Sequence, residues 1–123
     1  MKKVFLLIAM CGLLSACGAI VYPAKAVTDK GEVYTGETKV SLAGGSFHLD
    51  SKSGETCHGT FDPFFTEQVI MMYMSCSDGK HGKLAATRDL PLGTPSGTGN
   101  GVMSDGTKFT FAYGQSRIQE LDK

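Results

Sequence analysis

The 123-residue chain has no tryptophan, only four cysteines and four prolines, and no apolar run long enough to cross a bilayer. Its longest apolar run, residues 4–14, covers 11 residues, whereas a membrane-spanning helix needs roughly 20. A dominant charge is also missing, because twelve Lys and Arg balance twelve Asp and Glu. This balance offers no basic patch for nucleic acid and no polybasic stripe for an anionic surface, so we expect no nucleic-acid partner.

Long helical periodicity is absent too, and short β-prone runs alternate with clusters of Gly, Asp and Ser. This pattern is typical of an all-β domain built from hairpins. We therefore predict a small antiparallel β sandwich or barrel with a short irregular C-terminal tail that forms at most one or two helical turns. The expected strands are residues 32–42, 46–50, 56–61, 68–76 and 80–87, followed by a last hairpin whose arms are residues 101–104 and 107–113.

Three segments carry more specific predictions. Residues 68–76, "QVIMMYMSC", are the most apolar stretch after the leader, and we expect a central strand buried on both faces. Residues 88–101, "RDLPLGTPSGTGNG", are expected to be irregular. In "KFTFAY", Phe109, Phe111 and Tyr113 share one face of a strand, which predicts a contribution to the core.

The N-terminus has the three parts of an export signal: Lys2 and Lys3, the apolar run, and a small-residue site. The site reads Leu14-Ser15-Ala16-Cys17 and resembles the lipobox of bacterial lipoprotein precursors. The resemblance implies that the Cys17 thiol takes a diacylglycerol, that a peptidase cleaves before Cys17, and that the new α-amine is acylated. Several buried acyl chains make such attachment to a membrane effectively permanent.

The residue after Cys17 is Gly18 rather than Asp, and the lipoprotein resemblance then implies the outer membrane. We expect a signal peptide at residues 1–16, a lipidated tether at 17–30 and one β-rich domain at 31–123. After loss of Lys2 and Lys3, ten basic residues face twelve acidic ones, a net charge near −2.

Cys57 and Cys76 are the two cysteines left in the exported domain. Paired thiols in an oxidising compartment normally form a disulfide, so we predict a Cys57–Cys76 bridge. The alternative is a metal site made by Cys57, His58, Cys76 and His81. That set lacks the Cys-x-x-Cys spacing of structural zinc sites, and we expect no metal and no cofactor.

Catalytic patterns are also missing. His48, Asp50 and Asp62 can be combined with serines on paper, but no Gly-x-Ser-x-Gly elbow is present. The glycine-rich segment 97–101 lacks the Gly-Lys-Ser/Thr ending of a phosphate loop. The thioethers of Met71, Met72, Met74 and Met103 suit Cu(I), but strand alternation divides them between two faces and favours core packing. We therefore expect a non-enzymatic protein, with the histidines in solvent or, alternatively, two or three of them at a metal site.

Two segments, "MYMSCSDGK" and "SDGTKFTFAYG", resemble motifs of the membrane-bound inhibitors of C-type lysozyme. The chain departs from that family, because the partner of the strand cysteine lies upstream and Ser104-Asp105-Gly106 lacks the Ser-Gly order. We therefore transfer no inhibitory residues. The leading prediction is a lipid-anchored outer-membrane protein with a binding or structural role and a protein partner, and the alternative is a periplasmic inhibitor of a cell-wall hydrolase.

The lipobox predicts acylation at Cys17. Intact-mass spectrometry of the protein from its native membrane should show a chain that begins at residue 17 and carries diacylglycerol and acyl masses. Cys17→Ser should yield a precursor without them. A native N-terminus with a free Cys17 amine and no acyl mass would contradict the prediction.

Overall fold

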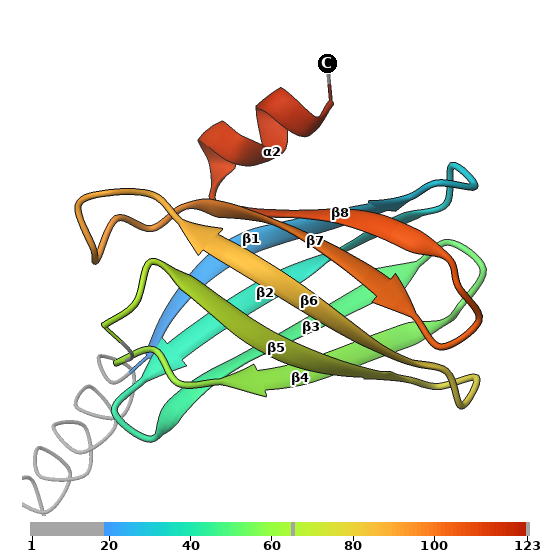
Figure 1. Cartoon of the computed structure of the whole chain (residues 1–123), viewed down its shortest axis with the longest axis horizontal. Coiled ribbons are helices and arrows are strands. Elements are labelled where there is room, and N and C mark those ends of the chain that lie inside the picture. The colour runs from blue at the N-terminus through green and yellow to red at the C-terminus, as the bar shows by residue number, and fades with distance from the viewer. Residues whose placement is uncertain (1–18, 65, 123) are drawn as a thin grey trace, which may run out of the picture.

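The computed structural model describes residues 19–64 and 66–122. Within them, eight antiparallel strands form a closed barrel, in which each strand pairs with its neighbours in chain order and the last pairs with the first (Figure 1). The elements are β1 (Ala19–Thr28), β2 (Val33–Ser41), β3 (Gly44–Ser51), β4 (Thr56–Phe61), β5 (Val69–Cys76), β6 (His81–Arg88), β7 (Gly97–Met103), β8 (Lys108–Tyr113) and helix α2 (Gln115–Leu121). Of the two predicted architectures, the barrel is confirmed.

The four hairpins at one end of the barrel share one turn geometry. Each contains a glycine with φ between 82° and 91°, and the N–H of that glycine bonds back to a carbonyl three residues earlier: Gly31, Gly54, Gly79 and Gly106. A type I turn followed by a left-handed glycine is a common tight connection between twisted strands. We call this end the hairpin end. The opposite end, here the open end, is formed by the connections 42–43, 62–68 and 89–96.

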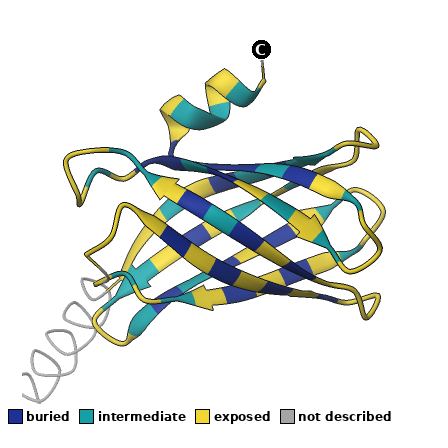
Figure 2. Ribbon diagram, in the orientation of Figure 1, coloured by how far each residue is buried: buried dark blue, intermediate teal, exposed yellow. Residues whose placement is uncertain are grey.

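Side chains alternate between the barrel interior and solvent along the strands (Figure 2). In β5 the alternation is complete, with every second residue buried. Interior side chains fill the barrel, as expected for eight strands. The largest fully buried ones are Phe111, Leu49 and Leu84, and the Phe111 ring lies 5.8 Å from the ring of Phe47.

Inward-facing glycines make room for the aromatic rings. A Cβ atom on Gly59 would lie 2.5 Å from the Phe47 ring, and one on Gly101 would lie 2.3 Å from the Phe109 ring. Real Cβ atoms do not approach other heavy atoms so closely, so neither position accepts a larger residue without movement. Many of the glycines therefore lie within strands, and not only in the turns that the sequence suggested.

The tether expected over residues 17–30 is wrong for residues 19–28, which form β1. Its Ala24 and Ala26 point inward and are buried, and β1 pairs with both β2 and β8. Without β1 the barrel would not close, so the folded domain begins at residue 19 rather than 31. Cys17 lies outside the described residues.

Two further predictions are corrected. The strand expected to be buried on both faces, β5, exposes Val69, Met71 and Tyr73 on its outer side.

The segment expected to be irregular, residues 88–101, is irregular only as far as Ser96, because residues 97–103 form β7. In β7 the inward positions are Gly97, Gly99 and Gly101, which leave the space that large side chains of β8 and β6 occupy.

The tail forms helix α2, within the one or two turns that the sequence allowed. The helix packs on the outside of β1 and β8, and Lys25 of β1 forms an ion pair with Asp122 at its end. No helix among the described residues is long and apolar enough to cross a membrane.

The final hairpin strand is predicted to be part of the core, and Phe111 tests this. The side chain is 1% exposed, so Phe111→Ala should lower the free energy of unfolding by about 3–5 kcal/mol. Lys108→Ala, on the exposed face of the same strand, should change it by no more than about 0.5 kcal/mol. Urea denaturation followed by circular dichroism measures both. Matching curves for Phe111→Ala and the parent would contradict the assignment.

Candidate functional site

The open end of the barrel contains an apolar cavity of about 120 Å³. Its inner wall consists of core side chains, among them Phe47, Ile70, Met72 and Phe111. Its mouth lies between two of the open-end loops, which contribute Pro63 from 62–68 and the pair Gly93 and Thr94 from 89–96. The volume is somewhat below the roughly 150 Å³ of a cavity that binds benzene, so the cavity suits an apolar group no larger than about one ring.

One polar atom in this cavity has no partner. The hydroxyl of Thr38 lines the cavity, the residue is 4% exposed, and no described residue hydrogen-bonds to its Oγ1. A buried hydroxyl without a partner costs about 1–3 kcal/mol, so a ligand that supplies a hydrogen bond there recovers that free energy. The sequence did not single out Thr38. The signal was the alternation Tyr34, Gly36, Thr38, Val40, which places the hydroxyl on the inner face of β2.

An ion pair fastens the longest loop at the mouth to helix α2. Arg117 donates to both carboxylate oxygens of Asp89, at 2.8 Å and 2.6 Å, and Ser96 Oγ donates to the same carboxylate at 2.6 Å. The guanidinium and then the Ser96 hydroxyl hold the pKa of Asp89 below its ordinary value. Loop 89–96 is thereby held at both ends beside the mouth.

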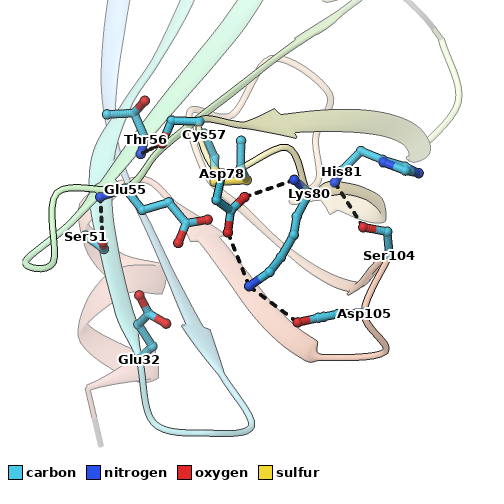
Figure 3. The surroundings of a disulfide bond; sticks show 12 residues. Glu32, Ser51, Glu55, Thr56, Cys57, Asp78, Lys80, His81, Ser104 and Asp105 are labelled. Carbon is cyan, nitrogen blue, oxygen red and sulfur yellow. Dashed lines mark hydrogen bonds and ion pairs between the residues drawn. A yellow bond between two sulfur atoms is a disulfide. The ribbon is translucent and has the colours of Figure 1, made fainter.

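A smaller cavity of about 70 Å³ lies at the hairpin end and is lined by charged groups. Lys80 Nζ lies 3.2 Å from Asp78 and 3.4 Å from Asp105 (Figure 3). A backbone N–H from Thr107 lowers the pKa of Asp105 to about 2. Burial, followed by the neighbouring Asp78, raises the pKa of the Glu55 carboxyl. Lys80 bridges the carboxylates of two adjacent hairpins and so ties these hairpins together, which is a structural role.

The same region contains the predicted disulfide, and the prediction is confirmed. Cys57 and Cys76 face each other across β4 and β5 with their sulfurs bonded. The two sulfurs and a Glu55 oxygen lie within 4.8 Å of one another, but sulfurs joined in a disulfide are not thiolates and do not bind metal as thiolates do. The alternative metal site that used Cys57, His58, Cys76 and His81 is therefore wrong for this oxidised state.

The histidines and aspartates that were considered for catalysis lie outside the barrel. His48 and His58 occupy opposite positions on β3 and β4 and are exposed, as is His81. Asp50 is exposed on the outer face, and Asp62 accepts a hydrogen bond from the Phe64 N–H in a loop. None of the five lines either cavity described above.

Strand alternation separates the methionines as expected. Met72 and Met74 are buried in the core, while Met71 points outward and is exposed. Met103 is half-buried against the core. Core packing is confirmed for the two inward methionines.

The two Ser-Asp-Gly turns of the segments resembling lysozyme inhibitors, residues 77–79 and 104–106, lie side by side at the hairpin end. Lys80 bridges Asp78 and Asp105, and the Ser104 N–H donates to His81 O at 2.7 Å. These contacts join β5–β6 to β7–β8 and bring together turns that are far apart in the sequence. An inhibitory role stays a prediction.

No family model and no curated protein matches the chain. Among solved structures, the chain is similar to the redesigned β barrel mFAP1 bound to DFHBI, with 15% identity over 77% of this chain and 92% of that one, at a TM-score of 0.56. It is also similar to mFAP0 bound to DFHBI, with 16% identity, 77% and 95% coverage and a TM-score of 0.58. A fluorescence-activating β barrel designed de novo matches at 16% identity, 76% and 88% coverage and a TM-score of 0.58. At this identity the likeness shows the barrel fold alone.

The Asp89–Arg117 pair predicts an acid-sensitive attachment of helix α2. The folded state lowers the pKa of Asp89. The pair therefore contributes its full stabilisation at pH values above the pKa of an aspartate in the unfolded chain, about 3.9. This stabilisation is lost as the pH falls through the lower pKa that Asp89 has in the folded state. Asp89→Asn should speed amide hydrogen exchange in α2 at neutral pH, with a stability loss of roughly 0.5–1 kcal/mol. Asp50→Asn, on the outer face of β3, is the control. Unchanged exchange in α2 of Asp89→Asn would contradict the attachment.

Proposed function

We propose that this protein is a lipid-anchored, non-enzymatic binding protein of the bacterial outer membrane, and that it binds a small apolar ligand in the open-end cavity. The observation that carries the binding role is the unpartnered Thr38 hydroxyl inside a mostly apolar cavity, whose lining also includes Arg88 and the tyrosines Tyr22 and Tyr113. Small-molecule sites commonly combine an apolar lining with a few directed polar groups. The ligand would be an apolar molecule with one hydrogen-bonding group.

The shape of the barrel supports the same proposal. Closed small barrels that bind ligands do so at their mouths, and here the mouth is at the end with the longer loops. Two of the similar designed barrels are described as bound to the small molecule DFHBI.

The anchor is supported by the sequence of residues 1–17 alone. The positive charges, the short apolar run and the four lipobox positions agree with one another. The proposal that the protein is not an enzyme rests on the positions of its histidines and of Asp50 and Asp62, which lie outside both cavities.

Binding can be tested with benzene, an apolar probe whose size is comparable to that of the cavity. The purified protein should bind benzene saturably at one site in isothermal titration calorimetry, and Thr94→Phe should weaken that binding at least about tenfold, because the added ring would fill the mouth. Ser53→Phe adds the same ring at an exposed position of the hairpin end and should leave the affinity unchanged.

A second variant tests the polar group. Thr38→Val keeps the shape of the side chain and removes the hydroxyl, so it should stabilise the empty protein in thermal melts while leaving the cavity open. Equal benzene affinity for the parent and Thr94→Phe, with circular dichroism showing that both are folded, would overturn the cavity as the binding site.

A further inference from the structure

The two ends of the barrel differ sharply in polarity. The connections at the hairpin end contain glycine and polar or charged residues and no apolar side chain: residues 29–32, 52–55, 77–80 and 104–107. The open-end connections instead carry large, exposed apolar side chains. Exposed polar tips are suited to water, whereas exposed apolar tips concentrated at one end mark an interaction surface.

Every described connection at the open end contributes to this surface. Leu42 of the β2–β3 turn is 90% exposed, Phe64 of the β4–β5 loop is 61% exposed, and the β6–β7 loop adds Leu90 and Leu92. We call these four residues the apolar rim. Phe65, which the sequence places beside Phe64, lies outside the described residues. Two of the connections that carry the rim, 62–68 and 89–96, also line the cavity mouth.

The chain length between the lipidation site and the barrel indicates what lies against the rim. Cys17 is two residues before Ala19, the first residue of β1. Two residues of extended chain span at most about 7 Å. Ala19 pairs with Ser41, which directly precedes Leu42. An acylated Cys17 therefore places the start of β1, and the Leu42 turn beside it, at the membrane surface.

The open-end connections contain three acidic residues, Asp62, Glu67 and Asp89. Asp89 is paired with Arg117, and the Asp62 carboxylate accepts the Phe64 N–H, whereas Glu67 is exposed beside the rim. The mature chain has a net charge near −2, so attraction to anionic lipid would contribute little. Burial of apolar side chains in the interface is the expected source of the binding free energy.

We propose that the apolar rim docks on the lipid surface that holds the Cys17 acyl chains, so that the barrel stands on its open end with the hairpin end toward water. This inference rests on the proposed lipid anchor. In this pose the cavity mouth opens at the membrane surface. The rim then acts as a second contact that fixes the orientation of a barrel otherwise held by one short linker.

The chain has no tryptophan, so a single introduced tryptophan is a specific reporter. Phe64→Trp reports on the rim, and Lys52→Trp reports on the hairpin end as the matched control. The acylated full-length mature protein is reconstituted in vesicles of phosphatidylethanolamine with a minor share of phosphatidylglycerol. Part of the lipid carries a nitroxide near the glycerol. Phe64→Trp should show blue-shifted emission and strong quenching, and Lys52→Trp neither.

A third protein tests the contribution of the leucines. Adding Leu42→Ser and Leu92→Ser to Phe64→Trp should reduce the quenching toward the level of Lys52→Trp, although the acyl anchor is unchanged. These positions are exposed, so the fold should persist, and near-ultraviolet circular dichroism checks it. A quenching level that the two serines leave unaltered would overturn the rim as the docking surface.

The remaining outcomes also decide the matter. Quenching of neither reporter, or of both equally, would overturn the upright pose. Blue-shifted but unquenched Phe64→Trp would mean that a protein partner or a second copy covers the rim, which also overturns lipid docking. Flotation with the vesicles and the acyl mass separately report the anchor, so a protein that floats without rim quenching refutes this inference and leaves the proposed function standing.

Discussion

The structure depends on fitting aromatic rings into the interior of an eight-stranded barrel. Eight strands leave a space that side chains can largely fill, and here Phe47, Phe109 and Phe111 provide much of the volume. Two of these rings need an inward neighbour without a side chain, which Gly59 supplies for Phe47 and Gly101 for Phe109. Closure, register and the position of the remaining cavities follow from this complementarity.

This constraint explains which predictions from the sequence held. The regular alternation in residues 56–61 and 108–113 predicts those strands, and the lone pair Cys57 and Cys76 predicts the disulfide. Hairpin turns with Asp-Gly were also recognisable. The predictions that failed concern strands whose inward-facing residues have small side chains or none. In "GTGNG" the glycines were taken for loop residues, although their spacing of two is that of one strand face.

The failure at residues 19–28 has the same origin. Ala24 and Ala26 are the buried residues of β1, and alanine at alternate positions gives a weak apolar signal beside the strong signal of the leader.

The open-end cavity was harder to predict from the sequence than any strand. Thr38 is unusual because its hydroxyl has no partner among the described residues, which depends on contacts from several strands rather than on its sequence neighbours.

The difference in polarity between the hairpin end and the open end also follows from the length of the connections. A tight hairpin with a left-handed glycine has few positions and places polar residues in all of them, and four such turns close one end with ion pairs such as Lys80 with Asp78 and Asp105. The longer connections at the other end have room for residues that the barrel does not need for closure. Leucine and phenylalanine exposed there do not stabilise the fold, since they stay in contact with water. Their presence around the cavity mouth is therefore best explained by a contact outside the barrel, and if Cys17 is acylated as proposed, its two-residue link to β1 would make the membrane the nearest apolar phase.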